Sequence, residues 1–202
     1  MSSTRALCVV VAPTPSSPER GRERVALQSE HARRAARLSA QAVGAPAPRF
    51  EKNAEDVPLA RDGWHWSVSH TTAHVAGVVC DAGVGVDIET HRDARAEVVE
   101  RVLSVRELAL LGELTPTMFL RAWTAKEAVL KELGAGLAKL SECRVVALEG
   151  PDVLRIECDG ALRRVQQLVD ARFVASVSSA DDRDATWISI ATPIGQSVES
   201  AP

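Results

Sequence analysis

One stretch of the chain combines a helical pattern of apolar residues with charges at unexpected positions. Residues 119–136 read FLRAWTAKEAVLKELGAG. Lys126 falls inside the apolar stripe of this helix, Glu127 at its edge, and Lys131 one turn beyond Glu127. Because a charge on a buried face is costly unless it is paired, hydrated or bound, we expect this helix to line a site. The stripe has the i, i+3, i+4, i+7 spacing and consists of Phe119, Ala122, Trp123, Val129, Leu130 and Leu133.

The first half of the chain alternates strand-like runs with one long helical segment. The apolar run 6–12 predicts a strand, and the Pro-, Ser- and charge-rich residues 13–24 predict a loop. A helix is expected over residues 25–43, because Gly44 and two nearby prolines end its pattern. Further strands are predicted at 64–70, 73–80 and 84–90, after a loop at 45–63.

The second half begins with helices and continues with short strands. Helices are predicted at 94–103 and 105–114, ahead of the helix that contains Lys126. Residues 161–168 are expected to hold at most local helix, and 193–202 are expected to be a flexible tail. Strands are predicted at 143–148, 153–157, 172–178 and 186–191.

Each half therefore offers helical chain and a few antiparallel strands, which predicts an α+β fold. We expect two similar lobes, residues 1–86 and 87–192, each with a small antiparallel sheet packed on helices. The strand with Asp87 and Glu89 then lies near the junction of the lobes.

Composition excludes few function classes, but it indicates the general class of protein and its expected cellular location. The chain has 202 residues, of which 46% are hydrophobic and 25% charged, as in ordinary globular proteins. A net charge of -3 gives no overall bias toward nucleic acid or anionic membranes, and no apolar run reaches the roughly 18 residues of a membrane span. We expect a cytoplasmic protein that is a monomer. No CxxC spacing occurs, so we expect its cysteines to be reduced and mostly buried. These cysteines are Cys8, Cys80, Cys143 and Cys158.

Three carboxylates are candidate ligands for a hard cation. Asp87 and Glu89 share one face of the strand 84–90, about 6.5–7 Å apart at the backbone, so both acids can reach one cation. With Glu127 they suit magnesium, and Lys126 and Lys131 beside them suit a phosphate-bearing substrate. Each signal has a plain alternative: a polar strand face for the two strand acids, and a helix-stabilising ion pair for Glu127 and Lys131.

Other candidate residues leave their role open. Ser69 and His70 are neighbours on a strand and point to opposite faces, so they do not form a nucleophilic relay with each other. His70 is either structural or a phosphate donor. The arginines on the first predicted helix and just before it, Arg33 and Arg24 among them, form either a solvated basic face or a local anion site.

Three ordered motifs resemble the 4′-phosphopantetheinyl transferases, most closely the surfactin-synthetase type. They are WSVSH at 66–70, GVGVDIE at 83–89 and WTAKEAVLK at 123–131. The resemblance implies an enzyme with two similar lobes that hold coenzyme A in the cleft between them. A serine of an apo acyl or peptidyl carrier protein would attack the β-phosphate, accept phosphopantetheine and release adenosine 3′,5′-bisphosphate.

The resemblance also implies roles for single residues. Magnesium would be held by Asp87, Glu89 and Glu127 together with the pyrophosphate of coenzyme A. Glu127, directly or through a metal-bound water, would take the serine proton. Lys131 would stabilise the leaving phosphate and Lys126 would assist with charge.

The coenzyme A phosphates would contact a second group of residues. Ser69 and His70 match family residues at these phosphates, with His70 at the 3′-phosphate, and Arg24 roughly matches an arginine that grips the same group. The chain departs from the family where Gly-Lys-Pro precedes the Ser-His strand, because it reads Asp56-Val57-Pro58. This departure leaves a second hypothesis open, a non-catalytic module that binds coenzyme A or carrier proteins. A phosphodiesterase is a third hypothesis, but no metal-ligand histidine pattern supports it.

Overall fold

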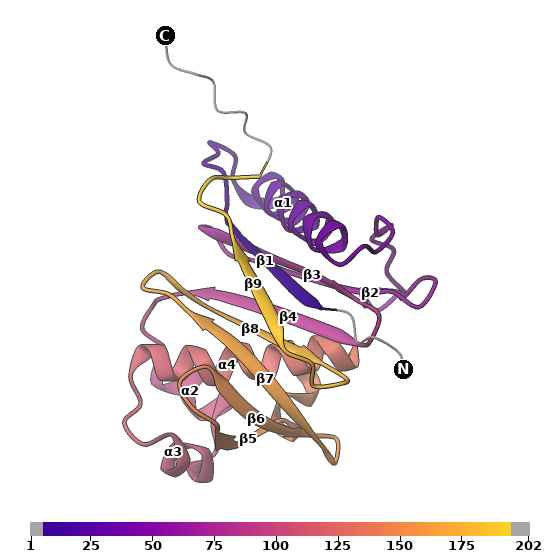
Figure 1. Ribbon diagram of the computed structural model, residues 1–202. Helices are drawn as coiled ribbons and strands as arrows, with labels where there is room; N and C mark the ends of the chain where they lie inside the picture. The colour runs from indigo at the N-terminus through magenta and orange to yellow at the C-terminus, as the bar shows by residue number, and fades with distance from the viewer. Residues whose placement is uncertain (1–5, 195–202) are drawn as a thin grey trace.

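The computed structural model describes residues 6–194 as four stacked layers. Helix α1 (Gly21–Ala42) covers a four-stranded sheet, and a five-stranded sheet lies below it (Figure 1). Helix α4 (Pro116–Leu133) covers the far side, with the short helices α2 (Ala96–Val102) and α3 (Val105–Leu111) nearby. The predicted α+β class, with two sheets packed on helices, is confirmed. The predicted tail lies largely outside the described residues.

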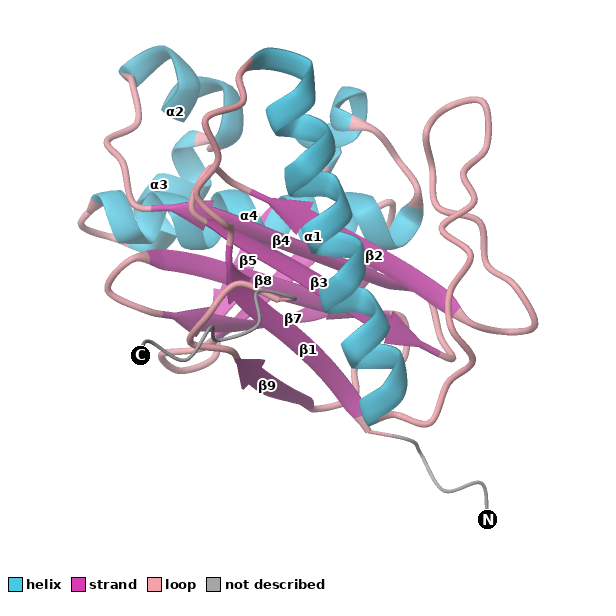
Figure 2. Cartoon of the chain, turned by 90° about the horizontal axis from the view of Figure 1, so that it is seen from above, coloured by secondary structure: helices cyan, strands magenta, loops and turns pink. Residues whose placement is uncertain are grey.

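The first sheet has the strand order β2-β3-β1-β9. Its strands are β1 (Leu7–Pro13), β2 (His65–His70), β3 (His74–Cys80) and β9 (Ala185–Ser189). Helix α1 lies across its outer face (Figure 2) and buries a row of alanines there, among them Ala32, Ala35 and Ala36. The helix is able to approach closely because residue 77 is glycine: a Cβ there would lie 2.3 Å from the Ala36 backbone nitrogen.

The second sheet has the order β4-β8-β7-β6-β5 and is antiparallel throughout. Helix α4 begins at Pro116, where the Thr115 hydroxyl accepts a hydrogen bond from the Met118 N–H, and ends at Gly134 in the left-handed conformation. Between β4 and α4 lie α2 (Ala96–Val102) and α3 (Val105–Leu111), and the 3₁₀ helix η1 (Leu137–Glu142) follows α4. The strands are β4 (Val84–Thr90), β5 (Arg144–Leu148), β6 (Val153–Cys158), β7 (Ala161–Val169) and β8 (Phe173–Ser179).

The two sheets pack face to face through an apolar layer. Val84, Val86 and Ile88 of β4 point into it, as predicted from their alternation with polar neighbours, and meet side chains of β1 and β3. The edge strands β2 and β4 also touch, because the Ser67 hydroxyl accepts a hydrogen bond from the Val86 N–H at 3.1 Å. Residues from both sheets therefore meet along this edge.

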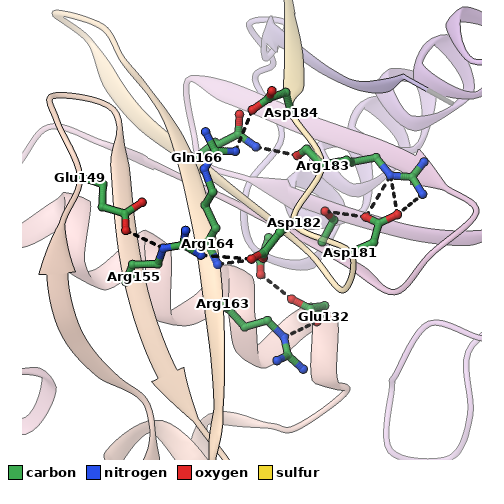
Figure 3. Close-up of polar contacts among 12 residues, drawn as sticks. Glu132, Glu149, Arg155, Arg163, Arg164, Gln166, Asp181, Asp182, Arg183 and Asp184 are labelled. Atoms are coloured by element: carbon green, nitrogen blue, oxygen red, sulfur yellow. Dashed lines mark hydrogen bonds and ion pairs between the residues drawn. The ribbon is translucent and has the colours of Figure 1, made fainter. Parts of the chain in front are cut away.

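The last strand returns to the first sheet and pairs parallel with β1. We expected this sheet to be antiparallel throughout, and it is not. An ionic cluster fixes the turn before it (Figure 3): Asp182 contacts Arg155 at 3.1 Å, and Asp184 contacts Arg164 at 2.8 Å. Arg183 pairs with Asp181 of the same turn and reaches Asp81 in the β3–β4 turn at 2.6 Å. The contacts tie β9 to both sheets, and the division of the chain near residue 87 stays a prediction.

Two local predictions were wrong. Residues 161–168 form strand β7 rather than helix: Val165 and Gln167 point inward, and the buried Gln167 amide bonds Arg121 and Ser176, which permits a polar residue there. The first helix begins at Gly21, four residues before the predicted start.

All four cysteines are buried, as predicted, but only two of them are reduced. Cys8 and Cys80 are buried free thiols, whereas Cys143 and Cys158 form a disulfide. The antiparallel register of β5 and β6 pairs Arg144 with Glu157, which places the two cysteines opposite each other. Sequence spacing alone did not reveal this pairing. Within the described part of the chain, no helix has the length and apolar character needed to span a membrane.

Close contact between α4 and β4 predicts that Gly85→Ala will be strongly destabilising. A Cβ at residue 85 would lie 1.9 Å from the Ala128 carbonyl oxygen, so helix and strand must separate. We expect the free energy of unfolding in urea to fall by about 3 kcal/mol, the upper end of ordinary over-packing costs.

Gly136→Ala is the matched control, because a Cβ at residue 136 meets no atom within 4 Å. It should change stability by less than about 0.5 kcal/mol. Equal stability of the two variants would contradict the close packing of α4 on β4.

Candidate active site

The candidate site lies where strands β2 and β4 meet helix α4. Gly85 lets α4 approach β4, and the alternation along β4 then points Asp87 and Glu89 toward the helix. From α4, Glu127 and Lys131 lie one turn apart and face the same region, because residues four apart share a helix face. The structure thus brings together four of the predicted site residues.

Asp87 is the centre of the hydrogen-bond network. Lys131 Nζ lies 2.7 Å from Asp87 Oδ1 and donates a second bond to the Val86 carbonyl at 3.1 Å. The Ser69 hydroxyl donates to the same Asp87 oxygen at 2.8 Å. The other carboxylate oxygen of Asp87, Oδ2, is buried and has no hydrogen-bond partner among the described residues.

Glu127 has the electrostatic character of a proton acceptor. Burial raises its pKa to about 7, the charges of Asp87 and Glu89 add to the rise, and Lys131 opposes it. Its Oε1 atom is buried and has no hydrogen-bond partner within residues 6–194. A carboxylate with a pKa near neutrality can accept a proton efficiently at physiological pH.

Glu89 completes the group at the solvent side. Its carboxylate accepts a hydrogen bond from the Trp123 indole at 3.4 Å and pairs with Arg92 at 3.3 Å. Burial raises its pKa first, followed by the charge of Asp87. Three acids therefore share one partly buried region.

The donor set fits a hard cation without forming a ready-made cage. No group of three or more Asp, Glu, His or Cys side chains in the described part of the chain is already arranged around a metal position. Lys131 occupies one oxygen of Asp87, and Arg92 and Trp123 occupy Glu89. The two buried oxygens without partners, on Asp87 and Glu127, are the atoms that a cation would satisfy.

A cationic pocket of about 210 Å³ adjoins the carboxylates. His70 stands in its wall with Nε2 3.2 Å from the Ser29 hydroxyl. Burial lowers the pKa of His70, and the positive charge of Lys131 lowers it further. The pocket is lined by Ser29, Arg33, Lys52, Trp66, Val68, Ser69, His70 and Lys131. Its charges suit an anionic ligand, and Lys131 connects it with the acids.

Two predicted site residues lie elsewhere. Arg24 is exposed on the first turns of α1 and is not among the residues that line the cationic pocket. Arg33, further along the same helix, lines it instead. The structure therefore places an arginine of the basic helix at the pocket, although not the residue that the sequence indicated.

Lys126 lies in the interior rather than at the site. Only 1% of its surface is exposed, and its Nζ pairs with Glu107 Oε1 at 2.6 Å and donates to the Val102 carbonyl. Glu107 in turn caps α3 through Ser104 and accepts the Val145 N–H. The charge in the apolar stripe is thus explained by a buried ion pair that fastens α2 and α3 to α4, and not by substrate contact.

Sequence reasoning did not single out Ser29, Arg33 or Lys52 for the pocket. Arg33 belonged to a basic helix face with no feature that marked one arginine above the others. Lys52 lies in a loop without periodicity, so only the three-dimensional path of that loop reveals its position.

Comparison with known protein families identifies the chain. The model of the 4′-phosphopantetheinyl transferase superfamily matches residues 83–185, just over half of the 202 residues. The chain belongs to this superfamily. The matched segment contains Asp87, Glu89, Glu127 and Lys131, so the carboxylate cluster lies within the part that phosphopantetheinyl transferases share.

Two curated 4′-phosphopantetheinyl transferases are similar to the chain. The psf-1 protein of Bacillus pumilus is 32% identical over 117 residues, covering 51% of this chain and 50% of the relative. The HetI protein of Nostoc sp. is 30% identical over 129 residues, covering 60% and 54%. The chain thus spans about half the length of the curated relatives it matches.

The contacts of Lys126 predict that Lys126→Met will lower stability. The substitution leaves Glu107 buried without its cation, and breaking such a pair costs about 3–5 kcal/mol. The free energy of unfolding in urea, followed by circular dichroism, measures this loss.

Lys139→Met is the control, because Lys139 is an exposed lysine that pairs with Glu142 across 3.7 Å. Its loss should cost less than about 1 kcal/mol. Unchanged stability of Lys126→Met would show that the interior ion pair does not hold α2 and α3 in place.

Proposed function

We propose that the chain is a magnesium-dependent 4′-phosphopantetheinyl transferase of the surfactin-synthetase type. It transfers the arm of coenzyme A to a serine hydroxyl of an apo acyl or peptidyl carrier protein and releases adenosine 3′,5′-bisphosphate. Family membership supports the reaction class, and the cationic pocket beside the acids suits the phosphates of coenzyme A. The proposal includes two lobes, residues 1–86 and 87–192, with the reaction at their junction in a cytoplasmic monomer.

The observation that carries the proposal is the state of Glu127. Burial raises its pKa to about 7, which equips its carboxylate to take the proton of the attacking serine, directly or through a metal-bound water. The serine oxygen forms a bond to the β-phosphorus, and the bond from that phosphorus to the bridging oxygen breaks. The electron pair leaves with adenosine 3′,5′-bisphosphate.

Other residues orient the substrate and balance its charge. Lys131 lies between the acids and the pocket, so its ammonium is placed to stabilise charge on the departing phosphate. Ser69 and His70 face the pocket as candidate phosphate contacts, with His70 at the 3′-phosphate. Magnesium, held by Asp87, Glu89 and Glu127, would neutralise the pyrophosphate when bound.

A binding module is the second candidate, and the Asp56-Val57 departure favours it. Asp56 has a φ of +64°, a conformation that glycine adopts without strain, and Val57 is uncharged where the resemblance leads us to expect a lysine. Such a module would bind coenzyme A or a carrier without turnover.

The transfer assay separates the two functions. We expect the protein, mixed with apo carrier proteins, coenzyme A and magnesium, to add one phosphopantetheine to a carrier, measured by intact-protein mass spectrometry. Coenzyme A binding by calorimetry, with no added mass on any of several carriers of different synthases, would instead establish the binding module.

Substitution of the acids tests the mechanism. Glu127→Gln should lower the transfer rate at least about 100-fold, because it removes a general base. Asp87→Asn should lower it comparably by removing a charge at the same site. Glu113→Gln, an equal change at an exposed position, should leave the rate unchanged. Near-normal turnover by Glu127→Gln, with its fold verified by circular dichroism, would exclude Glu127 as the base.

Removal of divalent cations tests the role of the acids as ligands. EDTA should abolish transfer and added magnesium should restore it, because the two unpartnered carboxylate oxygens fit a hard cation. Full activity of metal-depleted protein, with residual metal measured by mass spectrometry, would contradict the magnesium assignment.

A further inference from the structure

Two of the four lysines in the chain converge on the cationic pocket. The chain uses arginine for most of its cations and has lysine only at 52, 126, 131 and 139. Lys131 belongs to the candidate active site, whereas Lys52 comes from the loop between α1 and β2 and also lines the pocket. Lys126 is buried and Lys139 lies on η1. Lys52 is therefore a pocket cation without an assigned role.

The loop around Lys52 has a defined shape. Lys52 and Pro58 form an isolated antiparallel bridge, and the Asn53 side chain accepts hydrogen bonds from the backbone N–H groups of Glu55 and Val57. At its start, Phe50 packs edge-on against Trp66 of β2 at a ring separation of 5.0 Å. The first two contacts order the loop internally, and the Phe50 contact holds its start against β2, which forms a wall of the pocket.

Among residues 6–194, the ammonium of Lys52 has one direct acidic neighbour. Its Nζ lies 2.9 Å from Asp56 Oδ2, and the side chain of Lys52 is 32% exposed whereas that of Asp56 is 84% exposed. An exposed carboxylate holds a lysine weakly, and an ammonium has three donors. Lys52 can therefore bind an anion in the pocket, either while its ammonium still contacts Asp56 or after that contact has broken.

The charge of Lys52 reaches the opposite wall of the pocket. Burial lowers the pKa of His70, Lys131 lowers it further, and Lys52 contributes in the same direction. Ser29 holds the His70 ring by its Nε2 atom. Lys52, Lys131 and His70 thus surround one space, where they present donors from different elements.

We propose that Lys52 binds the phosphate monoester of the substrate and that Asp56 weakens this contact by sharing its charge. The inference rests on the proposed function, in which that monoester is the 3′-phosphate of coenzyme A. Lys52 lies across the isolated β-bridge from Pro58, and this pairing positions it at the wall of the pocket.

Calorimetry with two ligands tests the proposal. Coenzyme A carries the monoester phosphate and dephospho-coenzyme A lacks it, so their affinities isolate that one group. At fixed ionic strength, Lys52→Met should weaken coenzyme A binding about five- to tenfold, the effect of one partly solvated charged hydrogen bond. Dephospho-coenzyme A should bind this variant and the unaltered protein within about twofold of each other.

Two further variants test whether the effect of Lys52 on coenzyme A affinity is electrostatic. Asp56→Asn keeps a side chain that tolerates the φ of +64° and removes only the charge, so it should tighten coenzyme A binding about twofold. Lys139→Met removes an exposed, acid-paired lysine outside the pocket and should change neither affinity.

The outcomes separate this inference from the proposed function. Coenzyme A binding that Lys52→Met leaves unchanged, or weakens equally for both ligands, overturns the role of Lys52 while the transferase proposal stands. If Asp56→Asn binds coenzyme A more weakly than the unaltered protein, Asp56 does not oppose the contact between Lys52 and the phosphate. Failure of the unaltered protein to bind coenzyme A removes the proposed function, and the assignment of Lys52 falls with it.

Discussion

The contact among Lys131, Asp87 and Ser69 joins the parts of the fold on which the site depends. Lys131 belongs to α4, Asp87 to the edge strand of the second sheet, and Ser69 to the edge strand of the first. Burying a carboxylate costs several kcal/mol unless it is paired and hydrogen-bonded, and here its partners come from two other elements, α4 and β2. The position of each element is thereby linked to the geometry of one carboxylate.

The two lysines of α4 lie close together in sequence but have different surroundings, one in the interior and one at the candidate site. Lys126 points into the interior and pairs with Glu107, whereas Lys131 points to the acids and the pocket. Residues five apart on an α-helix are separated by about 140° around its axis, so the two ammonium groups face different surroundings. One cation holds helices together, and the other is available to a ligand.

The return of β9 to the first sheet pairs the last described strand with the first one. Its pairing with β1, and the contact of Arg183 with Asp81, tie the segment after β8 to the sheet that carries Ser69 and His70. The pocket therefore rests on a framework in which both sheets are connected by chain and by charge. Such cross-links restrict relative motion of the two sheets, which favours a preorganised site.

Much of the fold could be read from local patterns, because apolar periodicity and turn residues act over a few positions. The strand around Asp87, the helix around Glu127 and the α+β class were all recoverable, and so was the approach of Asp87 and Glu89 to one face. Strand β7 was missed because its charged and amide residues obscure the alternation, and the disulfide was missed because it depends on the register of β5 and β6.

The sequence by itself determined which residue types could do the chemistry: the three acids, Lys131 and the Ser-His pair. Only the tertiary structure decided which charges reach the site. It placed Lys126 in an interior ion pair, left Arg24 on the surface, and brought Arg33 and Lys52 to the pocket. The physical reason is that periodicity assigns a side chain to a face of its own element, whereas the partner of a charge is set by how separate elements pack.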